Sequence, residues 1–246
     1  PFGGRMPTQG RVESWKDVGI RPPKGVVRKE VRKGLEQQSR VALLYTGTIP
    51  WSIANSLQVD ALGRALDIRI REVVREEAGG SYDAGASAQL DRFPTEEYTV
   101  SISFGCSPQN VQPMTDLALK EVARLRAQGP EAVDVAKVKE MLSREHEQNL
   151  RENEYWLGSL QMLAMNGLDP AVMNDFDKRL AAVTAQNLKA KAVELLEECK
   201  ADGMVAAIGR GRFGDVRRQE TGGKGLAGVV EKAPDYFNPF LELMEA

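Results

Sequence analysis

The stretch SIANSLQVDALGRALDIRIREVVREEAGGSYDAGASAQL, residues 52–90, holds the change from a helical pattern to a strand pattern that decides the fold. Ser52 is a suitable N-cap, because its hydroxyl can accept a hydrogen bond from a free N–H of the first turn. Apolar side chains then recur at three- to five-residue spacing, which predicts a helix to about Ala78. They are Leu57, Leu62, Leu66, Ile70 and Val73. Gly79 and Gly80 predict the end of this helix, and YDAGASAQL predicts a strand after it.

Strand patterns also lie on both sides of this stretch. VVRKEVRK (residues 26–33) and SRVALLYTG (residues 39–47) are typical of strands, and we predict that they form a hairpin. EYTVSISFG (residues 97–105) alternates apolar and polar side chains, so one face points to a core and the other to water or a cavity. Helical patterns follow, and a last strand pattern ends the series. The helical ranges are 110–128, 130–166, 170–182 and 184–199, and the last strand is 203–209.

This order of elements indicates the fold class. Two strands, a helix, two strands, a helical block and a final strand do not alternate as a doubly wound parallel sheet would. We therefore predict an α+β fold with an antiparallel sheet of about five to six strands backed by helices. We expect this domain to span residues 25–209. Residues 1–24 are rich in glycine, proline and charge, which is typical of an interdomain linker or arm, and residues 210–246 form a C-terminal extension.

Composition excludes several classes of function. The 246 residues carry 33 basic and 35 acidic side chains, a formal net charge of -2, so charge gives no reason to expect nucleic acid as a partner. No apolar run reaches the roughly 18 residues needed to span a bilayer. The opening PFGGRM is neither a start methionine nor a signal segment, and we expect the chain to be part of a longer or processed protein.

Metal and thiol chemistry find little support in the residues. His146, in SREHEQ, is the one histidine, so the chain cannot form the two-histidine zinc helix of a metalloprotease. We interpret EHEQNLRENE instead as the solvated face of a long helix with opposite charges three and four residues apart. Cys106 and Cys199 are expected to be buried, unreactive thiols. No phosphate-binding glycine motif is present.

Arg75 and Tyr82, in REEAGGSY, remain as the candidate site residues. Their pattern alone leaves two interpretations open. Arg75 can pair with a carboxylate at a helix end, where cations are favoured, and Tyr82 can be a core ring with its hydroxyl at the surface. Alternatively, a guanidinium and a phenol held together in a cavity are donors suited to a developing negative charge.

The segment VVREEAGGSYDAGASAQL resembles the arginine-and-tyrosine segment of the pitrilysin/insulinase (inverzincin) family of zinc metalloendopeptidases, bacterial zinc-protease type. In that family a helix ending in R-E-x-x-G leads into a strand that begins with tyrosine. The resemblance extends over roughly residues 25–209 and includes SRVALLYTG, YTVSISFG and NEYWL. It implies a fold like one half of the mitochondrial processing peptidase.

The resemblance also implies a function. Members of this family enclose a chamber between two halves, and an H-x-x-E-H helix with a distal glutamate holds the zinc in the N-terminal half. The chain lacks H-x-x-E-H, so it is similar to a C-terminal domain that closes the chamber, binds no cofactor or metal itself and does not cleave peptides alone. Its partners would be a peptide substrate and the zinc-bearing half, in the same chain or in another subunit. Arg75 would hold a substrate carbonyl, and Tyr82 would stabilise the tetrahedral intermediate.

Further expectations follow from the same resemblance. Bacterial relatives of this shape are often exported, so a periplasmic location is the leading expectation. The polar strand faces around Ser101 and Ser103 would line the chamber, whereas Tyr155 and Trp156 are expected in helix contacts of the core. The alternative that stays open is a non-catalytic subunit of the same fold, similar to the core subunits of the respiratory cytochrome complex. The linker-like start disfavours a third possibility, a free-standing binding module.

Overall fold

A computed structural model describes residues 18–22, 25–32, 38–78, 83–196 and 203–210, and only the backbone of residues 32, 75–78 and 203–210. The described strands form one five-stranded sheet in the order β1-β5-β2-β4-β3. Their bounds are Val26–Arg32 (β1), Ser39–Thr48 (β2), Ala84–Asp91 (β3), Glu97–Cys106 (β4) and Gly203–Arg210 (β5). The mixed helix and strand fold is as predicted.

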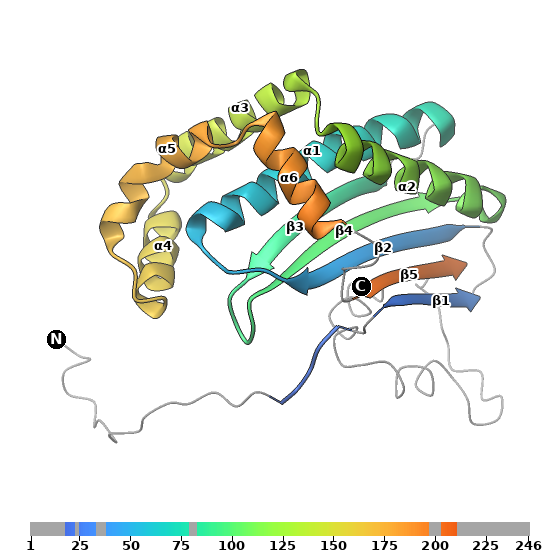
Figure 1. The fold of residues 1–246 in the computed structure, drawn as a ribbon, viewed down its shortest axis with the longest axis horizontal. Coiled ribbons are helices and arrows are strands. Elements are labelled where there is room, and N and C mark those ends of the chain that lie inside the picture. The colour runs from blue at the N-terminus through green and yellow to red at the C-terminus, as the bar shows by residue number, and fades with distance from the viewer. Residues whose placement is uncertain (1–17, 23–24, 33–37, 79–82, 197–202, 211–246) are drawn as a thin grey trace.

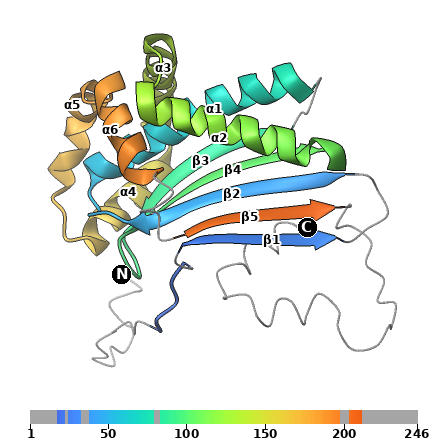
Figure 2. The same cartoon turned by 45° about the vertical axis from the view of Figure 1, so that its right-hand side comes forward.

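Helices cover one face of this sheet (Figures 1 and 2). The helix α1 lies over β3 and β4, while α2 and α6 pack beside it over β2. The helix α3 packs on α1, and α5 lies beside α3. The bounds are Ile53–Ala78 (α1), Val111–Gln128 (α2), Ala132–Asn149 (α3), Asn153–Met165 (α4), Phe176–Ala181 (α5) and Ala185–Leu195 (α6), with 3-10 turns η2 at Pro108–Asn110 and η3 at Pro170–Asp175.

The predicted hairpin between the first two strands is wrong. The strand β5 lies between β1 and β2, pairing parallel with β1 (Val26 opposite Met204) and antiparallel with β2 (Val41 opposite Ile208). The sheet is therefore mixed and not purely antiparallel, although β2, β3 and β4 pair antiparallel as predicted. Sequence patterns identify a strand from its own side chains, but they do not say which distant strand supplies the hydrogen bonds of its edge.

The long helix α1 begins as its sequence predicts. The Ser52 hydroxyl accepts a hydrogen bond from the Asn55 backbone N–H at 3.0 Å, which confirms Ser52 as the N-cap. Leu62, Leu66 and Ile70 are fully buried on the sheet side. The predicted end of the helix at Gly79 and Gly80 lies outside the described residues.

The alternation of β4 also has the predicted consequence. Tyr98, Val100, Ile102 and Phe104 are buried beneath the helices. The Tyr98 hydroxyl donates a hydrogen bond at 3.0 Å to the carbonyl of Leu195, at the end of α6. This buried bond joins the sheet to the last helix, so the ring of Tyr98 packs in the core while its hydroxyl is satisfied.

The single helix predicted over residues 130–166 is divided. The helix α3 ends at Asn149 and α4 begins at Asn153, with Glu152 in an extended conformation between them. The Trp156 indole N–H donates to the Leu150 carbonyl at 2.9 Å, which satisfies one of the acceptors at the end of α3. This segment contains neither glycine nor proline, so these two helix breakers do not mark the position of the break.

Candidate functional site

In the sequence, the predicted pair falls between the last turn of α1 and the start of β3. Arg75 is in the last turn of α1, and its side chain is outside the described part of the structure. Tyr82 also lies outside the described residues. Their roles therefore stay predictions, and the described neighbours on both sides define the surroundings of the site.

A carboxylate on α1 fixes the first residues of β3. The Asp67 carboxylate accepts a hydrogen bond from the Ala86 backbone N–H at 2.9 Å. The same carboxylate pairs with the Arg71 guanidinium, whose Nε lies 3.0 and 2.9 Å from the two oxygens. Arg75 follows Arg71 by one turn of α1, since positions four apart in the sequence are about one helical turn apart.

The residue after Tyr82 is also held in place. The Asp83 carbonyl accepts a hydrogen bond from the Gly105 N–H at 3.1 Å, and the Asp83 carboxylate pairs with Arg40 of β2 at 3.0 Å. These contacts connect the chain before β3 to the adjacent ends of β4 and β2. The first described residue after Tyr82 is thus held against β4 and β2.

On β3 and β4, the face of the sheet away from the helices carries polar side chains. Ser87 of β3 lies opposite Ser101 of β4, and Gln89 lies opposite Thr99. Ser103 follows Ser101 on the same face, since alternate residues of a strand share a face. None of the described helices packs on this face (Figure 2).

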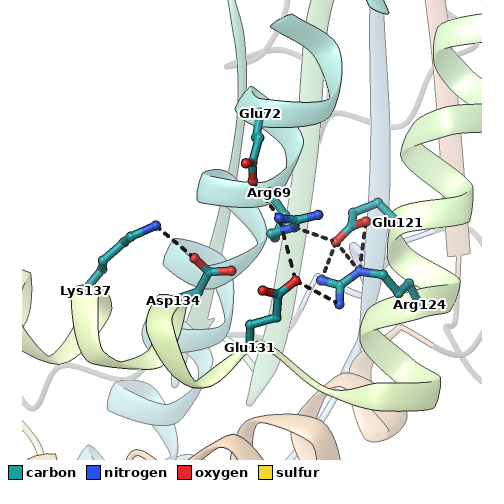
Figure 3. A network of polar contacts seen from close by, with 7 residues as sticks. All are labelled: Arg69, Glu72, Glu121, Arg124, Glu131, Asp134 and Lys137. Carbon is teal, nitrogen blue, oxygen red and sulfur yellow. Dashed lines mark hydrogen bonds and ion pairs between the residues drawn. The ribbon is translucent and has the colours of Figure 1, made fainter. Parts of the chain in front are cut away.

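A network of charged side chains connects α1 with α2 and the start of α3 (Figure 3). At its centre, the Glu121 carboxylate of α2 is 6% exposed and accepts hydrogen bonds from Arg124 at 2.7 Å and from Arg69 of α1 at 3.3 Å. The bond with Glu121 raises the pKa of the Arg124 guanidinium. Sequence reasoning missed this network: the three-residue spacing of Glu121 and Arg124 was a visible signal, whereas the contact with Arg69 was not.

The prediction that His146 lies on a solvated helix face is wrong. Its imidazole stacks on the Phe176 ring of α5 with centroids 3.7 Å apart, and the Tyr155 hydroxyl lies 3.4 Å from Nδ1. Burial lowers the pKa of His146, opposed by the nearby Asp177 carboxylate. The histidine therefore belongs to an aromatic contact that joins α3, α4 and α5.

Two other predicted roles change in the structure. Tyr155 is half-buried in this aromatic contact, but Trp156 is 41% exposed and does not belong to the core. Cys106 is partly exposed, and burial raises the pKa of its thiol, which disfavours the reactive thiolate. Cys199 lies outside the described residues.

The described residues show neither a metal-ligand cluster nor a membrane-spanning helix. No group of three or more His, Cys, Asp or Glu side chains among them is placed to hold a metal ion. Within the same residues, every helix is too short or too polar to cross a membrane.

The mixed sheet with helices on one face defines an α+β domain. The family model described as the peptidase M16 inactive domain matches residues 6–142, more than half of the chain. The chain therefore belongs to the peptidase M16 family, the pitrilysin/insulinase type of zinc protease that its Arg75–Tyr82 segment resembles.

Individual relatives agree with this assignment. A zinc protease PQQL-like protein of Arabidopsis thaliana is 30% identical over 147 residues, which are 55% of this chain and 15% of that protein. The periplasmic protease PqqL of Escherichia coli superposes with a TM-score of 0.65 at 17% identity, covering 77% of this chain and 21% of that one. A peptidase M16 inactive domain from Pseudomonas fluorescens gives a TM-score of 0.63 at 18% identity, over 76% and 44% of the two chains. The chain thus spans only a part of the length of these proteins.

The C-terminal part of the chain has a second similarity. The family model described as the D-lysine 5,6-aminomutase TIM-barrel domain of alpha subunit matches residues 162–243. The lysine 5,6-aminomutase alpha subunit of Fusobacterium nucleatum is 53% identical over 60 residues, which are 24% of this chain and 12% of that subunit. This second similarity concerns a short segment. Of the residues that the family model matches after residue 196, most lie outside the described residues.

Proposed function

We propose that this chain is the C-terminal domain of a zinc metalloendopeptidase, in which it closes the catalytic chamber and supplies Arg75 and Tyr82. Membership of the peptidase M16 family, with a match to its inactive domain, is the observation that carries the proposal. The domain would be residues 25–209, with residues 1–24 as an arm and 210–246 as an extension.

The chemistry assigned to the two side chains follows from their donors. Zinc, held by the N-terminal half, would polarise the scissile peptide carbonyl. The Tyr82 hydroxyl would donate a hydrogen bond to the oxygen of that carbonyl as it becomes negative. The Arg75 guanidinium would donate to a neighbouring substrate carbonyl and keep the peptide in register. One such donor to an oxyanion contributes about 3 to 4 kcal/mol, roughly 100- to 1000-fold in rate.

The described surroundings support this arrangement. Asp67 holds Ala86 of β3 against α1, and the contacts of Asp83 hold the chain immediately after Tyr82. Preorganisation of this kind is what an electrostatic contribution to catalysis needs, because the donors then need not reorganise during the reaction. The polar sheet face with Ser101 and Ser103 would contribute to the chamber wall.

The partner in this proposal is the zinc-bearing N-terminal half, in the same polypeptide or in another subunit, and the isolated chain is inactive. The periplasmic location stated for the similar PqqL favours an exported protein. A non-catalytic subunit of the same fold is the alternative function, and it requires no zinc-binding motif in the partner.

The test uses the full-length protein with its zinc-bearing half. Tyr82→Phe removes one donor and should lower peptide turnover by about two to three orders of magnitude with an unchanged melting temperature. Arg75→Gln should mainly raise the KM for peptides. Tyr155→Phe, in the helical contact, is the matched control and should leave turnover unchanged. Normal turnover with a large loss of stability in Tyr82→Phe would assign the tyrosine to the core instead.

A further inference from the structure

We propose that a pocket at the beginning of α1 binds the carboxylate of an N-acylated amino acid with an apolar side chain. The pocket has a volume of about 600 Å³ and lies between the first residues of α1, the loop after β3 and the segment of η3 and α5. It is separated from the position of Arg75 by 22 residues of helix, or roughly 33 Å. The inference is independent of the proposed function.

Arg92 is the first of two arginines of this pocket whose guanidinium groups are held in place by neutral groups. Its Nη1 donates to the Asn166 side-chain oxygen at 2.7 Å and to the Asn166 carbonyl at 3.2 Å. The guanidinium also lies over the Trp51 ring, 5.1 Å from its centroid. No carboxylate in the described ranges forms an ion pair with it, so its position is fixed by neutral groups and its charge is not compensated.

Arg179 is the second guanidinium, and it is held in a similar way. Its Nη1 donates to the Val172 carbonyl at 2.7 Å, and it is half-buried. Within the described part of the chain it too has no carboxylate partner at ion-pair distance. Arginines elsewhere in the fold, such as Arg64 and Arg124, pair with carboxylates. Two half-buried guanidinium groups without a carboxylate, lining one pocket, favour an anionic ligand.

The other charged side chains of the pocket leave its lining with more basic than acidic groups. Lys178 adds a third cation, while Glu96 and Asp175 are exposed and form no ion pair with the two arginines. The first turn of α1 contains no acidic residue, so the positive end of its helix dipole adds to the potential. The lining thus has three basic and two acidic side chains.

Two further features indicate which class of anionic ligand the pocket would bind. Gln58 lines the pocket, and its side-chain oxygen is buried without a hydrogen-bond partner among the described residues, so a rotation of this amide would let the oxygen accept from a ligand N–H. Trp51, Ile53 and Leu168 supply apolar surface beside it. A carboxylate, an amide N–H and an apolar side chain occur together in N-acyl amino acids and at the C-terminus of a peptide. The volume is within the range of about 300 to 1,000 Å³ that is usual for small-ligand sites.

The experiment is calorimetric titration of the whole chain with N-acetyl-L-leucine and with N-acetyl-L-leucinamide. The two probes differ only in the carboxylate, so we expect binding of the acid and at least tenfold weaker binding of the amide. Equal binding of both, or binding of neither at millimolar concentration, would overturn the proposal. Inorganic phosphate is the third probe. A heat of binding that equals that of the acid would show a general anion site and also contradict the assignment.

Variants locate the site. Arg179→Gln and Arg92→Gln should each weaken binding of N-acetyl-L-leucine about tenfold, whereas Arg144→Gln, an exposed arginine on α3, should leave it unchanged. An affinity in all three variants that equals that of the unsubstituted chain would mean that the ligand binds elsewhere.

A peptide ending in leucine then distinguishes the source of the ligand. Tighter binding than the acetylated amino acid points to peptide C-termini, and equal binding points to a free acyl amino acid.

Discussion

A Cβ atom on Gly63 of α1 would lie 2.4 Å from the backbone nitrogen of Ala88 in β3 and 2.9 Å from its Cβ. The obstacle is backbone, which cannot turn away as a side chain can. The close approach of the helix to the edge strand therefore depends on glycine at this position.

Gly63→Ala should destabilise the fold by about 1 to 3 kcal/mol, because the added methyl group forces α1 away from β3. Gly158→Ala is the matched control, since Gly158 lies in α4 with nothing within 4 Å of an added Cβ. That change should stabilise by about 0.5 to 1 kcal/mol. Chemical denaturation of both variants measures the difference, and equal effects would contradict the close approach.

Asp67→Ala should loosen the start of β3. The carboxylate is the partner of the Ala86 N–H, and a half-buried N–H left unpaired costs about 1 to 3 kcal/mol. We expect faster hydrogen exchange at Ala86 and a lower melting temperature. Asp116→Ala, which removes only an exposed contact with Gln112, should change neither. An unchanged exchange rate at Ala86 in Asp67→Ala would show that the bond contributes nothing.

Glu121→Gln should cost about 3 kcal/mol of stability, because two guanidinium groups then face a buried amide in place of a carboxylate. Glu140→Gln removes the exposed partner of Arg144 and should cost at most about 0.5 kcal/mol. Urea denaturation compares the two variants. Similar losses in both would mean that burial of Glu121 adds nothing to the strength of the network.

His146 should make the fold less stable in mild acid. Burial lowers its pKa below 6.5, so the unfolded chain binds the proton more tightly than the folded chain. The contribution of the neutral ring is present above pH 6.5 and is lost as the pH falls through the folded pKa. Asp177 and Glu147 oppose this shift, and Arg179 supports it.

The measurement is direct, since His146 is the one histidine of the sequence. Its imidazole C–H resonances should titrate below pH 6.5, and His146→Gln should flatten the dependence of the melting temperature on pH between about 7.5 and 5.5. A resonance that titrates above 6.5 would contradict the burial of the ring against Phe176.

Local signals explain where prediction from the sequence worked. The cap at Ser52, the buried face of α1 and the alternation of β4 were predictable, because each depends on side chains within a few residues of one another. The Arg75–Tyr82 segment pointed to the family in the same way, since it is contiguous. The roles of the two residues remain predictions.

Errors arose where distant parts of the chain meet. His146 was assigned to a solvated face because its partner Phe176 belongs to another helix. The break between α3 and α4 has no glycine or proline, and a bond from Trp156 to the end of α3 accompanies it. The pocket of Arg92 and Arg179 could not be predicted either, because its two guanidinium groups come from separate elements.

The sequence by itself determined the kinds of element, their order and the family, because periodicity and motif spacing are properties of neighbouring residues. Only the tertiary structure decided that β5 enters between β1 and β2, that Arg69 meets Glu121 across 52 positions and that Tyr98 reaches Leu195 across 97. Such contacts depend on how complete elements pack and on which buried polar groups need a partner, and these conditions exist only once the chain is folded.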